Sequence, residues 1–355
     1  MAEASPWVGL TSSATSGDWY FNEDENAPTP GYSAMWEAKC IHQFNHRFSS
    51  YAQTSRERKL DGEPVSFRSL TDASATIVTR YHIPAAVWSQ HLSNRQSFTS
   101  GACGYRDVAR STDERTMIAA VVPFAGFMQP LNGVSHQNPA GLLRLVACLN
   151  SFALDFACRQ KTPGTHVNVT ICRQLPVVWD SEHSGLARCA GSDPRSWLLQ
   201  RALELTYTAW DLEPFVQDCG WSGPPFRWDE ERRFLLRCEL DAAFFHLYLP
   251  ATPDGQWKPA RIAEGGVRDE TPEELAELKR RFPTPRDAVA YIMDTFPIVK
   301  RKDEAKYGDY RTKLLILDIY DRMQEAITTG RPYQTILDPP PADPRCCHPP
   351  RGEDR

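Results

Sequence analysis

The hydrophobic pattern of this chain changes near residue 193. Before that point, the alternating runs 116–122 and 166–171 predict strands, while 142–160 repeats apolar residues every three or four positions, as a helix does. After it, the periodic runs have helical spacing, and Asp229 and Thr271 stand where helix N-caps are expected. The sequence therefore predicts an α+β fold, in which a mixed α/β region precedes a mostly helical one.

Four segments follow from this division. We expect an acidic, flexible lead-in at 1–31 with a short strand at 18–22, a mixed α/β region at 32–180, a mostly helical region at 181–335 and a proline-rich tail at 336–355. The remaining elements are predicted as a strand at 76–81, loops at 49–75 and 123–139, and helices at 196–212, 229–248, from 271, 286–294 and 310–328.

Charge and hydropathy restrict the environment of the chain. The formal net charge is −5, and the lead-in accounts for all of it with Glu3, Asp18, Glu23, Asp24 and Glu25 and no basic residue. Nucleic-acid binding would therefore depend on local basic patches. No apolar run approaches the roughly 18 residues of a membrane helix, and the first thirty residues lack the features of a signal peptide. We expect a cytoplasmic protein without a membrane partner.

The cysteines favour core packing over metal binding. No two of the ten form a CxxC pair, and Cys346-Cys347-His348 falls short of the roughly four ligands that a tetrahedral site needs. Most of the cysteines stand in apolar surroundings, which is typical of small core residues. We predict no metal site.

The strongest basic cluster spans 300–313, where six basic residues and two tyrosines accompany three acids. Long cations beside aromatic rings suit contact with a phosphate backbone. A solvated loop before a surface helix would have the same composition, so both interpretations stay open. The candidate contacts here are Lys300, Arg301, Lys302, Lys306, Arg311 and Lys313.

Three further segments carry candidate DNA contacts. Lys39 and Arg47 belong to a basic stretch at 39–59. Arg106, Arg110 and Arg115 are suited to pairing with guanine or phosphate, although Asp107, Asp113 and Glu114 offer internal ion pairs instead. The connection 159–168 could enter a groove or simply join two elements; its candidates are Arg159, Lys161, Gly164, Thr165 and His166.

Motifs of catalysis are missing from the sequence. It contains no GxGxxG, GxxxxGK[ST], HExxH or GxSxG pattern. The nearest match to the (Asp/Asn)-Pro-Pro-aromatic loop, which holds a flipped adenine, is Asp338-Pro-Pro-Pro, where proline replaces the aromatic residue. We assign no catalytic residue and expect no cofactor in this chain.

Several segments, taken in order, resemble the C-terminal part of large single-chain adenine-specific DNA methyltransferases of type IIG restriction-modification and of BREX- and DISARM-like phage defence. They cover residues from about 32 to 338, with Tyr105 in place of a tryptophan and Pro163 in place of a glycine. The similar segments are YSAMWEAKCIHQFNHRF (32–48), TRYHIP (79–84), YRDVARSTDERTMI (105–118), NSFALDFACRQK (150–161), GTHVN (164–168), QLP (174–176), LDAAFFHLY (240–248), YIMDTFPIVKRKDE (291–304) and YGDYRTK (307–313).

The resemblance implies recognition of double-stranded DNA for a methyltransferase that acts on adenine N6. In that family, S-adenosylmethionine and methyl transfer belong to an amino-terminal half whose motifs this sequence lacks, so a separate catalytic chain is an expected partner. The shared segments imply framework or backbone contacts, and the unmatched segments 49–104, 124–140 and 249–270 imply sequence specificity. Two alternatives stay open: a restriction-system protein with its own nuclease activity, and an interaction subunit that does not bind DNA.

Overall fold

An antiparallel sheet of four strands organises the amino-terminal half. The computed structural model describes residues 8–10, 20–21, 31–93, 100–123, 125–178, 193–261 and 268–352. The order of the strands is β1 (Val8–Leu10), β10 (Leu131–Ser135), β7 (Gly101–Arg106) and β8 (Ala119–Pro123). Successive side chains of a strand point to opposite faces. Cys103 and Val121, which are paired in register, therefore face the helices, while Ala102 and Val122 join a second core.

That second core lies against a smaller sheet. Its strands are ordered β2 (Tyr20–Phe21), β6 (Tyr81–Pro84), β3 (Tyr32–Trp36) and β9 (Gly126–Phe127), with β9 parallel to β3. Trp36, Ile41 and Phe127 are buried between the two sheets. Around them lie the 3₁₀ turn η1 (Ala38–Cys40), the pair β4 (Ser49–Ser50) and β5 (Val65–Ser66), and the helices α1 (Arg56–Leu60) and α2 (Ala85–Ser93).

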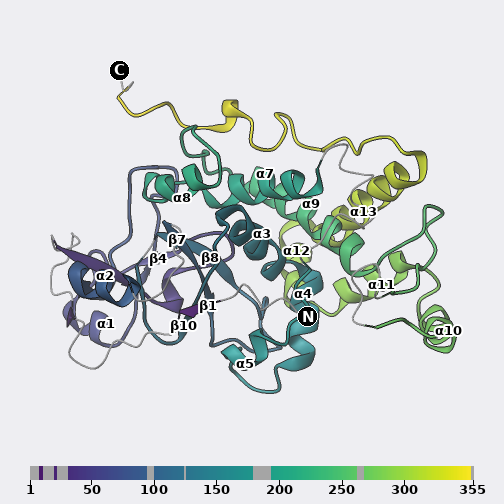
Figure 1. Ribbon diagram of the computed structural model, residues 1–355, viewed down its shortest axis with the longest axis horizontal. Coiled ribbons are helices and arrows are strands. Elements are labelled where there is room, and N and C mark those ends of the chain that lie inside the picture. The colour runs from purple at the N-terminus through teal and green to yellow at the C-terminus, as the bar shows by residue number, and fades with distance from the viewer. Residues whose placement is uncertain are drawn as a thin grey trace.

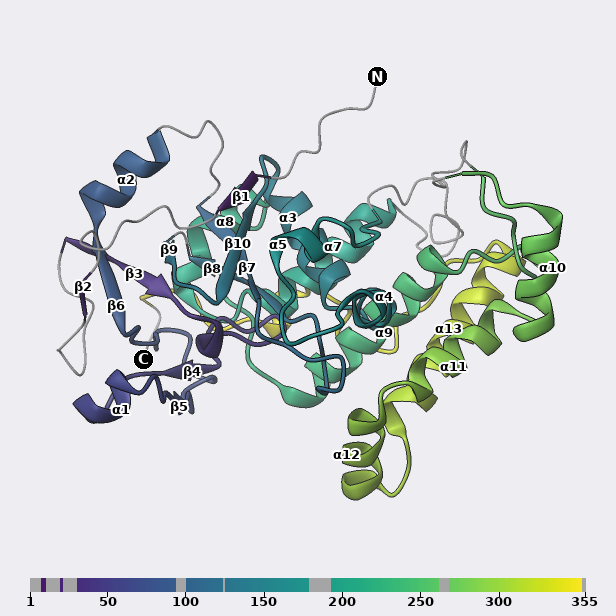
Figure 2. The same ribbon diagram turned by 90° about the horizontal axis from the view of Figure 1, so that it is seen from below.

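Helices cover the other face of the first sheet and continue away from it (Figures 1 and 2). Helix α3 (Pro139–Leu149) packs on β7 and β8, and α9 (Glu230–Tyr248) packs on α13 (Arg311–Thr329). This part of the structure confirms the predicted α+β class and the helical C-terminal region. Its other helices are α4 (Phe152–Lys161), α5 (Val169–Cys172), α7 (Pro194–Thr206), η2 (Trp210–Leu212), α8 (Glu213–Asp218), α10 (Pro272–Arg281), α11 (Pro285–Asp294), α12 (Pro297–Tyr307) and η4 (Pro344–Cys346).

The helix predicted at 142–160 is two helices, α3 and α4, bent by 68°. The side chain of Asn150 exchanges two hydrogen bonds with the backbone of Ala119, at 3.0 and 2.8 Å, and so pairs with β8. Ser151 then caps α4 by accepting from Leu154 N–H, and the carboxylate of Asp241 accepts from Phe152 N–H at 2.7 Å. These contacts satisfy the backbone groups that the break exposes.

The structure differs from the prediction at two expected loops and two expected strands. The loop at 49–75 contains β4, α1 and β5, and the loop at 123–139 contains β9 and β10. The strand expected at 76–81 begins only at Tyr81, as β6. The strand expected at 166–171 is a single bridge between His166 and Val108, followed by α5. Helix forms there because the side chain of Asn168 accepts from Ile171 N–H at 2.9 Å, an N-cap contact.

The two ends of the chain contact the folded body. Most of the acidic lead-in lies outside the described residues, but β2 falls within the strand expected at 18–22, and β1 adds a strand that was not expected. The proline-rich segment packs on helices instead of forming a free tail. Cys346 O accepts from Arg227 N–H, and His348 N–H donates to Pro225 O, both at 2.8 Å.

Among the described residues, no single helix has the length and apolar character needed to cross a membrane; α3 and α4 meet that test only jointly, as a bent pair.

Candidate nucleic-acid interface

Arg47 is a framework residue and not a surface contact. Its side chain is 0% exposed, and its guanidinium donates to the carbonyls of Asp72, Ala75 and Thr208 at 2.7–2.9 Å. A guanidinium carries five donors, so one buried arginine can join several loops through their carbonyl groups. The structure therefore removes Arg47 from the candidate DNA contacts.

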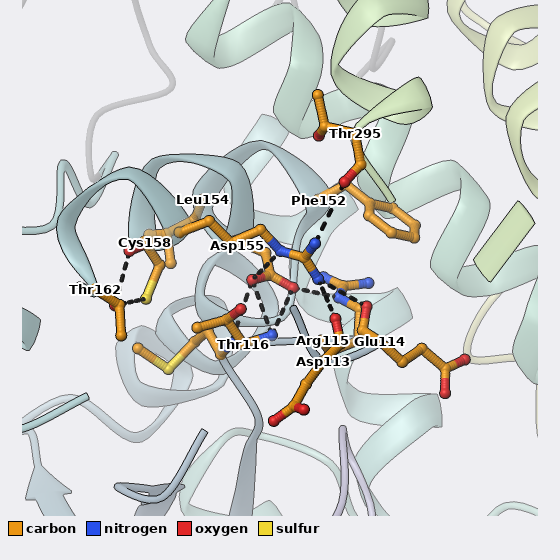
Figure 3. A network of polar contacts seen from close by, with 12 residues as sticks. Asp113, Glu114, Arg115, Thr116, Phe152, Leu154, Asp155, Cys158, Thr162 and Thr295 are labelled. Atoms are coloured by element: carbon orange, nitrogen blue, oxygen red, sulfur yellow. Dashed lines mark hydrogen bonds and ion pairs between the residues drawn. The ribbon is translucent and has the colours of Figure 1, made fainter. Parts of the chain in front are cut away.

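Arg115 and Arg159 converge on the buried carboxylate of Asp155. Figure 3 shows how Arg115 and Asp155 lie in this network. Arg115 Nε donates to Asp155 Oδ2 at 2.6 Å, and Arg159 Nε lies 3.6 Å from Asp155 Oδ1. The same carboxylate accepts from the backbone N–H of Thr116 at 3.0 Å. Both guanidinium groups also lie over the ring of Phe296. These two arginines hold the segment 107–116 in place, which corrects their prediction as DNA contacts.

Arg106 has a similar structural role. Its Nε donates to Ile41 O at 3.1 Å, and its guanidinium lies over the ring of Phe48. Burial lowers the pKa of Arg106, although the group stays protonated. Lys39 is exposed, but its ammonium donates to Gly62 O at 2.5 Å and so ties η1 to the end of α1.

The turn after α4 stays exposed, together with Arg110. Lys161, Gly164, Thr165 and His166 are all on the surface. The turn is attached to the segment 107–116 because Ala109 N–H donates to Thr165 O at 3.0 Å. Glycine is not required for this geometry, since a Cβ on Gly164 would meet nothing within 4 Å.

The basic cluster at 300–313 is a helix and not a loop. Helix α12 ends at Gly308, whose φ of 80° suits glycine as the C-terminal cap. Lys300, Arg301, Lys302 and Lys306 are exposed on this helix. Of these, Lys302 forms an ion pair with Glu114 on the segment 107–116.

The last two candidates of the cluster lie beyond α12. Arg311 pairs with Glu231 and lies over the rings of Phe234 and Tyr307. Lys313 pairs with Asp294 at 2.7 Å. Both cations therefore hold α13 against neighbouring helices, and we place them in the framework.

The segment 107–116 lies between two segments that carry exposed basic residues and contacts both of them. It contacts the turn at 161–166 through Ala109 and contacts α12 through Glu114. We call this the basic surface. It comprises Arg110, Lys161, His166, Lys300, Arg301, Lys302 and Lys306.

A cavity of about 230 Å³ opens beside α12, between that helix, α9 and the bend that joins α3 to α4. Arg237 of α9 lines this cavity, and no sequence pattern had identified it. The only available signal was a cation among the apolar residues FLLRCEL of a helix. His42, which the sequence singles out only as part of a basic stretch, also lines it.

Over the described ranges, no three His, Cys, Asp or Glu side chains are grouped as a metal ion would require. Cys346 and Cys347 pack in the main core. The chain matches no family model, no curated protein and no solved structure.

Proposed function

We propose that this chain binds double-stranded DNA and recognises the target site for an N6-adenine DNA methyltransferase of a restriction-modification or phage-defence system. The observation that carries the proposal is the basic surface, in which the exposed basic residues of α12 and of the turn at 161–166 lie on two segments that both contact residues 107–116. Methyl transfer and S-adenosylmethionine belong, in this proposal, to a catalytic unit outside this sequence.

The cations of α12 suit phosphate contact better than base reading. Lys300, Arg301 and Lys306 are exposed on one helix, and long flexible cations of this kind neutralise phosphates irrespective of sequence. Among the described residues, no ion pair or hydrogen bond engages the guanidinium of Arg301. It is therefore available to a phosphate without breaking an existing contact.

The division between framework and surface also supports the proposal. The segments that resemble the methyltransferase family contain Arg47, Arg106, Arg115 and Arg159, and these arginines hold loops together from the inside. Such a framework would be common to proteins that read different sites. We propose that base recognition belongs to the unmatched segments 124–140 and 249–270 and to 49–104 outside the similar segment 79–84; within them, 94–99, 124 and 262–267 lie outside the described residues.

Replacing Lys300, Arg301 and Lys306 together with alanine is expected to weaken binding to all duplex sequences about equally. Each lost phosphate contact lowers the steepness of the salt dependence, so the slope of log K against log salt should fall by up to about 3. Fluorescence anisotropy with two unrelated duplexes, measured at several salt concentrations, provides both quantities.

The matched control replaces Lys279, Arg280 and Arg281 with alanine. These residues are exposed in the last turn of α10, away from α12 in Figure 2, and the change removes the same number of charges. We expect the control to bind as the unaltered protein does. Equal losses in both variants, or a loss confined to one duplex, would contradict the assignment of α12 to backbone contact.

A further inference from the structure

The cavity beside α12 holds a cation that the fold does not satisfy. Within the described part of the chain, no hydrogen bond or ion pair engages the guanidinium of Arg237. Burial lowers the pKa of Arg237, and Glu230 and Asp241 attract the group without reaching ion-pair distance. Arg237 is only half-buried and lines the cavity, so its guanidinium can meet an incoming anion there.

The two neighbouring arginines of α9 do have partners for their guanidinium groups. Arg233 stands one turn earlier, and it donates to Leu205 O at 2.6 Å and to Phe44 O at 3.4 Å. Arg232 pairs with Glu204 and donates to Pro339 O at 2.7 Å. Of these three, Arg237 lines the cavity beside α12, and its guanidinium has no acceptor among the residues that the structure describes.

The rest of the cavity favours an anion. Lys302 lines it and pairs with Glu114, which lines the outer part of the same cavity. The pKa of His42 is lowered to about 3, first by burial and then by Arg106, Arg237, Arg115 and Lys302, so positive charge surrounds this imidazole. The two buried carboxylates are already occupied, because Asp241 accepts from Phe152 N–H and Asp303 accepts from Thr312 N–H at 2.6 Å.

We propose that this cavity binds a phosphate group, with Arg237 as the donor that grips it and Lys302 as a second cation at the rim. A guanidinium matches the oxygens of a phosphate with two parallel hydrogen bonds. The volume of about 230 Å³ exceeds that of several water molecules but falls below the roughly 300–1,000 Å³ of sites for larger ligands. The phosphate belongs either to a nucleic-acid backbone or to a small phosphorylated molecule.

A larger depression on the molecule, of about 730 Å³, is less suited to binding an anion. Of its three arginines, Arg232 pairs with Glu204, Arg345 pairs with Asp343 at 2.9 Å, and Arg227 donates to the carbonyl of Arg345. An incoming anion would have to displace these carboxylates, whereas at Arg237 it would supply a missing partner.

Thermal unfolding in the presence of inorganic phosphate tests the inference independently of DNA binding. For the unaltered protein we expect a saturable rise of about 1–3 °C in Tm at several times the dissociation constant, beyond that caused by sodium chloride of equal ionic strength. Arg237→Met should lose this rise while its Tm without phosphate stays equal or increases, because an unpaired charge is removed. Arg322→Met, on the exposed side of α13, is the control and should keep the rise.

The inference is overturned if phosphate and chloride act alike on the unaltered protein, or if Arg237→Met retains the full rise. Arg237→Gln serves the same purpose should the methionine variant fail to fold. Repeating the titration with excess duplex distinguishes the two sources of the group. If excess duplex abolishes the phosphate-dependent rise in Tm, the cavity binds a backbone phosphate. If the rise persists, the cavity binds a small phosphorylated ligand, and this conclusion holds even if the chain does not bind DNA.

Discussion

Replacing Asp155 with alanine is expected to lower the free energy of unfolding by about 3–5 kcal/mol, the usual cost of breaking a buried ion pair from one side. The carboxylate is 0% exposed and accepts from Arg115 Nε and from the backbone N–H groups of Thr116 and Met117. Its removal leaves the guanidinium of Arg115 buried without a counter-charge. The measurement is urea denaturation at neutral pH.

The consequence reaches the basic surface, because Asp155 anchors the segment 107–116 from inside. Asp155→Ala should therefore also weaken DNA binding, even though the carboxylate itself contacts no DNA. Asp321→Ala is the matched control, since its ion pair with Arg286 is 2.6 Å long but about half exposed. An exposed pair contributes about 0–1 kcal/mol. If both variants lost similar stability, the central role given to Asp155 would be wrong.

A second large decrease in the free energy of unfolding is expected for Glu239→Ala. Glu239 is 0% exposed, pairs with Arg201 Nε at 2.7 Å, and accepts from Tyr333 Oη, Thr335 Oγ1 and Ile336 N–H at 2.7–3.0 Å. One carboxylate thus fastens the segment after α13 to α9 and α7. We expect a loss of about 3–5 kcal/mol, because the change removes a buried carboxylate that pairs with Arg201 and accepts from three further donors.

Two observations separate this explanation from a general loss of packing. Hydrogen exchange should increase first in residues 333–336, which Glu239 attaches to α9. The double variant Arg201→Met with Glu239→Met should regain part of the lost stability, since it removes both charges. A double variant that is less stable than Glu239→Ala would contradict the ion-pair explanation. Glu277→Ala, which affects only exposed pairs with Arg280 and Arg281, should change stability little.

Local signals in the sequence predicted local structure well. The N-cap at Asp229 and the capping box at Thr271 are both present, because each depends on hydrogen bonds between residues three positions apart. The division into a mixed region and a helical region was also correct, since it depends on periodicity within each segment. The missed helix α12 has a composition dominated by charge, which hid its short apolar face.

Contacts between distant residues account for the errors. The break between α3 and α4 depends on Asn150 meeting Ala119, which is 31 residues away. Arg115 has acidic neighbours in sequence, yet its partner is Asp155, 40 residues further on. The basic surface depends on Lys302 meeting Glu114 across 188 residues. Contacts between residues this far apart in the sequence leave no local pattern. Buried framework arginines and exposed surface arginines therefore look alike in the sequence.

We propose that this chain binds duplex DNA through phosphate contacts of the basic surface. The most direct measurement is the affinity of the purified chain for a mixed-sequence duplex as salt is raised from about 50 to 200 mM. We predict measurable binding at the low end and a steep, log-linear decrease, as release of counterions from several phosphates requires. Absence of binding at about 50 mM, or an affinity that does not change with salt, would contradict the account.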